Sequence, residues 1–74
     1  MASVLHLLKA GHDALPLAVI ERDLQAGHAV AVALLPGAES PALPAGVRLH
    51  RVTRDLSWDQ LLDLVFAADT VITW

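Results

Sequence analysis

Four short runs of strand-type residues alternate with two amphipathic segments, and this alternation limits the folds that the chain can adopt. The runs cover residues 3–8, 29–35, 47–52 and 70–74, and the first two are apolar without regular alternation. Continuous apolar runs are typical of parallel strands that are buried on both faces. With right-handed crossovers, the order β-α-β-β-α-β predicts an α/β fold, a small parallel Rossmann-like sheet with helices on its faces.

The first amphipathic segment carries the signals of a helix over residues 14–26. Asp13 is a candidate N-cap, and Pro16 falls in the first turn, where its missing N–H costs nothing. Apolar residues follow at three- and four-residue spacing, as expected for a helix with one buried face. Gly27 is the predicted stop signal.

The second helix is marked by a capping box, in which Ser57 is the N-cap and Gln60 the third helical residue. It is predicted to run to about Ala68. Between the second and third strands, residues 36–46 contain three prolines and two glycines. This composition predicts a loop where larger proteins of the same architecture carry a helix.

The size of the chain indicates one domain, residues 1–74, that is stabilised by association. A domain this short buries only about 60% of the surface that its unfolded chain exposes. Hydrophobic residues nevertheless make up 55% of the chain, and the mean hydropathy is +0.54. Part of this apolar surface should face outward, so we expect a homo- or hetero-oligomer.

Several classes of function are disfavoured by composition. The chain has no cysteine, which excludes disulfides, thiolate zinc sites and thiol redox chemistry by its own residues. The net charge is −3, and the five cations are Lys9, Arg22, Arg48, Arg51 and Arg54. Three of them lie between residues 48 and 54, which is a local patch and not the basic stripe of a nucleic-acid-binding protein. We therefore expect no direct binding of nucleic acid.

No membrane segment or leader is expected from the sequence. The longest clean apolar run, residues 29–35, has seven residues, whereas a transmembrane helix needs about 20. Residues 1–9 lack the basic region and the apolar length of a signal peptide. These features predict a cytoplasmic protein.

A small-anion or nucleotide site is one candidate function, at the carboxyl ends of the strands. In open α/β sheets ligands gather at this edge. Lys9, Gly11 and His12 follow the first strand and precede a helix N-terminus, which favours anions, and Arg54 follows the third strand. The segment has one glycine, whereas dinucleotide and phosphate loops need two or three.

No catalytic constellation is convincing, so we do not expect an enzyme that acts alone, and we expect no cofactor. His12 and Asp13 are adjacent, and adjacent side chains seldom point the same way; Asp13 is also a candidate cap. The candidate nucleophiles are Ser40 and Ser57, and Ser57 is also a cap.

No metal spacing is present among the four histidines, which are His6, His12, His28 and His50. We expect His6 and His50 to lie on neighbouring strands, buried or half-buried and bonded to backbone groups. Asp55, Asp59 and Asp63 recur at four-residue spacing. Such a row is more typical of a solvated helix face than of a carboxylate metal site.

The two tryptophans, Trp58 and Trp74, are the candidate interface residues, because tryptophan is enriched at subunit interfaces. For Trp74 two placements remain open at this point. Its ring folds back over the core of its own chain, or it lies in a contact between subunits.

Four pieces of the chain together resemble the DsrH/TusB family of the DsrE-like proteins. They are the opening VLHLL at 4–8, the helix closing at Gly27 before an Ala/Val/Leu strand, the segment VTRDL at 52–56 before a helix, and Trp74. The chain is shorter than is usual in that family, and the missing part falls at the proline-rich loop, where the family has a helix.

The resemblance implies a small α/β subunit that assembles with related subunits. Such assemblies pass persulfide sulfur along a relay, in tRNA 2-thiouridine formation or in sulfur oxidation. Some members carry a cysteine for this step, and this chain has none, so no active-site residue carries over. The compatible role is a non-catalytic partner of a cysteine-bearing DsrE-like subunit.

Overall fold

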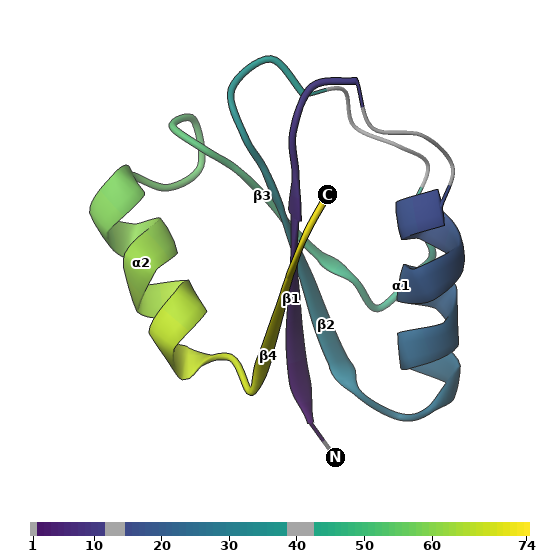
Figure 1. The fold of residues 1–74 in the computed structure, drawn as a ribbon. Helices are drawn as coiled ribbons and strands as arrows, with labels where there is room; N and C mark the ends of the chain where they lie inside the picture. Colours follow the sequence, from purple (N-terminus) through teal and green to yellow (C-terminus); the bar gives the residue numbers. More distant parts are fainter. Residues whose placement is uncertain (1, 12–14, 39–42) are drawn as a thin grey trace.

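A computed structural model of the chain describes residues 2–11, 15–38 and 43–74, with the side chain of Leu15 left out. It forms one four-stranded, fully parallel sheet in the order β3-β2-β1-β4, seen nearly edge-on between its two helices in Figure 1. This confirms the predicted small Rossmann-like α/β fold. The elements are β1 (Ser3–Leu8), α1 (Leu15–Gln25), β2 (Ala29–Leu34), β3 (Arg48–Arg51), α2 (Trp58–Ala67) and β4 (Thr70–Thr73).

The two helices lie on opposite faces of the sheet because the chain reverses its direction across the sheet (Figure 1). The steps from β1 to β2 and from β2 to β3 run the same way, and the step from β3 to β4 returns past both central strands. With crossovers of one hand, connections that run in one direction share a face, and the returning connection takes the other. Accordingly, Ala38, Leu43 and Val47 of the β2–β3 loop pack on the α1 side.

The face that α1 covers holds one of two hydrophobic clusters, called here the α1-face core. Its buried members are Leu8, Ile20, Val30, Val32 and Leu34. They come from β1, β2 and α1, and Ile20 is the contribution of the helix. Together, the helix, the loop and Trp74 cover this side of the sheet.

The second cluster, the α2-face core, lies on the opposite side. Its buried members are Leu5, Ala33, Val52, Leu56 and Leu61. Leu61 is the one buried residue of α2, and Leu64 and Val65 pack beside it half-buried. This face is therefore covered by the ten-residue helix α2 and by Val52 and Leu56 of the segment that precedes it.

The first strand is predicted correctly, whereas the other three are predicted one residue too long at one or both ends. Residues 29–35, 47–52 and 70–74 were expected, whereas β2 ends at Leu34, β3 spans Arg48–Arg51 and β4 ends at Thr73. The bounds of a strand are set by its backbone hydrogen bonds to the neighbouring strand, which residue type alone does not reveal. The candidate N-cap Asp13 lies outside the described residues.

The end of α1 agrees with the prediction made from Gly27. Its φ of 83° is the left-handed conformation that glycine adopts without strain. The Gly27 N–H donates to the Leu24 carbonyl at 3.0 Å, and the His28 N–H donates to the Asp23 carbonyl at 3.1 Å. This pair of bonds is a Schellman motif, which satisfies carbonyls that the end of a helix would leave free.

The capping box predicted at the start of α2 is present. The Gln60 N–H donates to Ser57 Oγ at 3.2 Å, and the Ser57 N–H donates to Gln60 Oε1 at 2.7 Å. Among the described residues, neither helix has the length and apolarity that a membrane crossing requires.

Because Ser57 satisfies a helix N–H that would otherwise lack a partner, we expect Ser57→Ala to lower the free energy of unfolding by about 1 kcal/mol. The control is Ser57→Asp, whose carboxylate caps a helix equally well and should retain most of the stability. Urea unfolding followed by far-UV circular dichroism measures both variants. Equal losses in the two variants would contradict a capping role.

Candidate functional site

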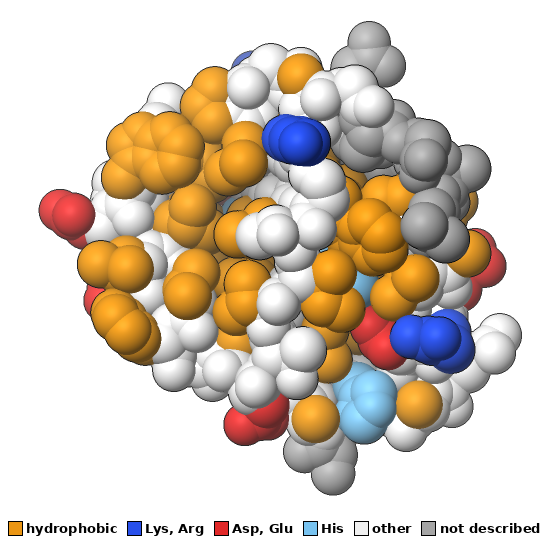
Figure 2. All heavy atoms as spheres, in the orientation of Figure 1, with side chains coloured by type: hydrophobic (Ala, Val, Ile, Leu, Met, Phe, Trp, Pro, Cys, Tyr) orange, Lys and Arg blue, Asp and Glu red, His pale blue; other side chains and the backbone are white. Residues whose placement is uncertain are grey.

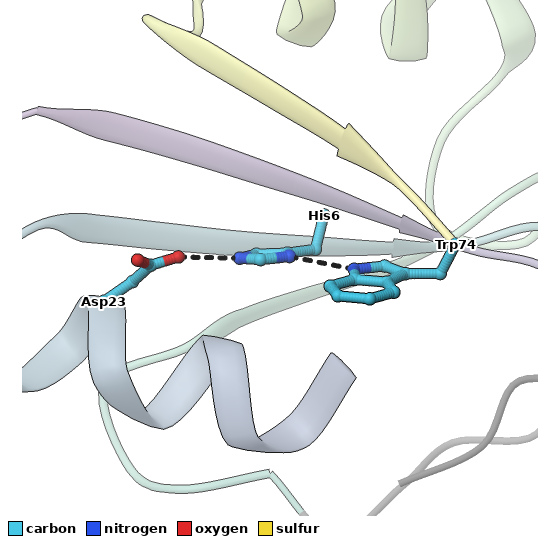
Figure 3. Close-up of polar contacts among 3 residues, drawn as sticks. All are labelled: His6, Asp23 and Trp74. Atoms are coloured by element: carbon cyan, nitrogen blue, oxygen red, sulfur yellow. Dashed lines mark hydrogen bonds and ion pairs between the residues drawn. The ribbon is translucent and has the colours of Figure 1, made fainter. Parts of the chain in front are cut away.

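A buried histidine joins three elements across the α1 face of the sheet. His6 of β1 has no exposed surface, and its ring lies between Asp23 of α1 and Trp74, the residue after β4 (Figure 3). His6 Nε2 is 3.0 Å from Asp23 Oδ2, and Trp74 Nε1 donates to His6 Nδ1 at 3.1 Å. The two rings meet edge to edge and are nearly coplanar, 12° apart with centroids separated by 6.2 Å.

The indole of Trp74 determines which nitrogen of the His6 ring carries the hydrogen. An indole N–H only donates, so His6 Nδ1 must be the acceptor, and Nε2 carries the hydrogen that is directed at Asp23. No buried side-chain nitrogen or oxygen among the described residues is left without a partner. The trio is therefore a fully satisfied polar network, which costs little to bury and fixes the relative positions of α1, β1 and β4.

This trio does not have the geometry of a catalytic centre, although an Asp–His pair is part of hydrolase triads. In a triad the second ring nitrogen faces a hydroxyl or thiol nucleophile that the substrate can reach. Here that nitrogen faces an indole N–H, and the His6 ring is closed to solvent. We assign the trio a structural role.

The structure corrects two expectations about the histidines. His6 is buried as predicted, but its partners are the side chains of Asp23 and Trp74 and not backbone groups. His6 and His50 are not on neighbouring strands, because β2 lies between β1 and β3. Strand order is set by the crossovers, and a lone sequence does not show which strands become neighbours.

Of the two placements left open for Trp74, the structure shows the ring folded over its own chain. It is half-buried, packs on the α1-face core and bonds His6. Sequence reasoning missed Asp23 as a partner. Its spacing from Ile20 on α1 was the available signal, because residues three apart on a helix lie on one face.

The residues predicted to bind an anion at the carboxyl edge are not all brought together. Lys9 and Gly11 follow β1, and Arg54 follows β3, with β2 between them. Strands are about 4.8 Å apart, so two strand spacings, roughly 10 Å, separate the two sets at this edge. All three residues are exposed, and His12 lies outside the described residues.

The row of aspartates does not form a metal site in the described part of the chain. Asp55 precedes α2, and its Oδ2 accepts from the Arg51 N–H at 2.8 Å in the turn after β3. Asp59 and Asp63 lie on α2 and are exposed. The described residues contain no group of three or more side chains of the metal-binding types close enough to share an ion.

An apolar stripe on the outer side of α2 contains most of the exposed large hydrophobic residues in the described part of the chain. Trp58, Leu62 and Phe66 are 55%, 52% and 79% exposed and recur every four residues, so they lie along one side of the helix. Val71 of β4 is a further exposed apolar residue, at 36%. Figure 2 shows hydrophobic side chains gathered at the left of the molecule, where Figure 1 places α2.

The stripe contains one of the two tryptophans singled out from the sequence, Trp58, while Trp74 lies on the α1 side of the sheet. In the sequence, Leu61, Leu62 and Phe66 all belong to one wide apolar face of the helix. The structure divides that face between an inner side with Leu61 and an exposed outer side.

If the trio is a stabilising network, Trp74→Phe should lower the free energy of unfolding by about 1–3 kcal/mol, because it leaves the buried His6 Nδ1 without a donor. The same change at exposed Trp58 is the matched control, and it should cost no more than about 0.5 kcal/mol. Urea unfolding followed by far-UV circular dichroism compares the two. Equal effects at Trp58 and Trp74 would show that the hydrogen bond contributes nothing.

Comparison with known proteins leaves the function to be inferred from the residues of the chain and their geometry. No family model, curated protein or solved structure matches it. The resemblance to the DsrH/TusB family therefore remains a likeness of sequence pattern, and the arrangement of exposed and buried side chains is the basis for the proposals that follow.

Proposed function

We propose that this chain is a non-catalytic subunit that acts by association, and that the outer stripe of α2 is its docking surface. The observation that carries the proposal is the exposure of Trp58, Leu62 and Phe66 on one side of a helix. The inner side of the same helix already packs on the sheet through Leu61, so the outer residues are not needed for the fold.

The exposure of these side chains is costly in an isolated domain. Burying one large apolar side chain stabilises by about 1.5–3 kcal/mol, and three such groups lie side by side here. A helix that is apolar on its inner and outer sides is typical of a buried helix, whereas α2 of the single chain is buried on one side. A second protein that covers the stripe would complete the burial.

The charges beside the stripe favour a partner of different sequence over a second copy. Asp59 and Asp63 flank the stripe, and α2 carries no basic residue. Two copies that packed stripe to stripe with antiparallel helices would bring their acidic rows together, and like charges repel. A partner with an apolar patch bordered by lysine or arginine would complement both features.

The partner that we propose is a cysteine-bearing DsrE-like subunit of a cytoplasmic sulfur relay, in tRNA 2-thiouridine formation or sulfur oxidation. Two features support it: the family resemblance of the sequence and the lack of any cysteine in a chain with an exposed docking surface. In this assignment the thiol of the partner carries the persulfide sulfur, and this chain shapes the complex without contributing a reacting atom.

The test is affinity purification of the tagged chain from its native host, followed by native mass spectrometry. The chain should be recovered in a defined complex with a cysteine-bearing DsrE-like subunit. Phe66→Ser should reduce recovery of the partner by about thirtyfold, the effect of losing an interface hot spot worth about 2 kcal/mol. Ala67→Ser, on the same helix and also exposed, is the control and should leave recovery unchanged.

Recovery of the chain alone, at its own mass of 7.9 kDa, would overturn the proposed association. A defined complex with a partner that lacks cysteine would retain the docking role and overturn the sulfur relay. An effect of Ala67→Ser equal to that of Phe66→Ser would show that the stripe is not the contact.

A further inference from the structure

A cleft of about 400 Å³ opens on the α2 face of the sheet, beside the amino-terminal half of β2 and along β3. Ala29 and Ala31 form its apolar floor, and Leu64 of α2 contributes to its wall. Arg48, His50 and Ser3 add polar groups to the lining. None of these residues belongs to the docking stripe or to the carboxyl-edge site predicted from the sequence.

The cleft exists because α2 covers only part of its face. The helix packs on Leu5 in the middle of β1, on Ala33 near the carboxyl end of β2 and on Val52 just beyond β3. The amino-terminal part of β2 carries alanines on this face, so nothing large fills the space beside the helix. A depression with one apolar wall and one polar wall remains.

Strand register places Arg48 and His50 over this depression. Arg48 pairs with Ala31 of β2, and His50 pairs with Ala33. Because Ala33 belongs to the α2-face core, the side chains of Arg48 and His50 also lie on the α2 face. Residues two apart on a strand are separated by about 7 Å, which lets two side chains reach one ligand. Within the part of the chain that the structure describes, neither side chain has a hydrogen-bond or ion-pair partner.

We infer that this cleft binds a small organic anion, with a phosphate monoester or carboxylate head held by Arg48 and His50. A guanidinium offers paired N–H donors that match the oxygens of either head, and an imidazole adds a further donor. At about 30 Å³ for each water-sized group, 400 Å³ accommodates a ligand of roughly a dozen non-hydrogen atoms. Its apolar body would lie on Ala29, Ala31 and Leu64.

One carboxylate, that of Asp69, contacts a residue that lines the cleft. Asp69 is bonded to the amino end of β1, where its Oδ2 accepts from the Ser3 N–H at 2.8 Å, and it is not among the described residues that line the cleft. The inference is also independent of the proposed docking, because Leu64 and the stripe residue Leu62 lie on different sides of α2.

The experiment is a titration of the ¹⁵N-labelled chain with phenyl phosphate, benzoate and neutral phenol, followed by amide chemical shifts. The two anions represent the phosphate and carboxylate heads, and phenol is the uncharged control. We expect at least one anion to give saturable shifts at residues 29–31 and 48–50, and phenol to give none. Whichever anion binds more tightly identifies the head group that the cleft prefers.

Matched variants locate the site. Arg48→Gln and His50→Gln should each weaken anion binding, the former by about tenfold, as expected for loss of a charge-assisted hydrogen bond. Arg54→Gln makes the same change in charge at the opposite edge of the sheet and should change the affinity by less than about twofold. Phe66→Ser should leave binding intact while reducing partner recovery.

Three results would overturn the inference. Absence of saturable shifts with both anions would show that the cleft does not bind this class of ligand. Equal binding of phenol would show that the positive groups are not used. Loss of binding in Arg54→Gln but not in Arg48→Gln would place the anion site at the carboxyl edge. Unchanged circular dichroism of the variants establishes that each remains folded.

Discussion

The ring of His6 lies at the centre of the structure, and its two hydrogen bonds connect parts that the sheet alone would hold loosely. The strand that carries it, β1, pairs with β2 on one side and with the short edge strand β4 on the other. Asp23 connects the ring to α1, and Trp74 connects it to the end of β4. An unsatisfied imidazole at zero exposure would be strongly unfavourable, so the three elements must be in place together.

The two faces of the sheet differ in how completely they are covered. On one face α1, the β2–β3 loop and Trp74 provide the cover, and on the other α2 and the segment that precedes it cover part of the sheet. Both proposals derive from this difference. The outer stripe of α2 is left exposed by its own chain, and a cleft remains between α2 and β3. A small domain has too few residues to close every surface that its elements create.

Local signals in the sequence were sufficient to predict the helices and strands, but not which of them become neighbours in the fold. The Ser57–Gln60 pair and Gly27 specified helix ends through contacts a few residues apart, and the structure confirms both. The placement of His50 two strands from His6 depends on strand order, which local patterns do not encode. The bond between Trp74 and His6 spans 68 positions, and no periodicity reveals such a contact.

The candidate sites illustrate the same limit. Arg48 and His50 alternate with apolar residues in the sequence, but the cleft beside them exists because α2 covers only part of this face. Lys9 and Arg54 were grouped because both follow strands, and the strand between them separates the two. The exposed side of α2 was missed because a run of apolar residues does not show which of them the sheet has room to bury.

The position of β4 in the sheet also bears on how the chain folds. The unit of β1, α1 and β2 is built from contacts within the first half of the chain, whereas β4 must return across the sheet to reach β1. Contacts over long separations close late, because their entropic cost is met only once a template exists. Until β4 docks, one side of the His6 imidazole lacks the indole and faces water. We therefore expect solvent to be excluded from that ring only when β4 docks.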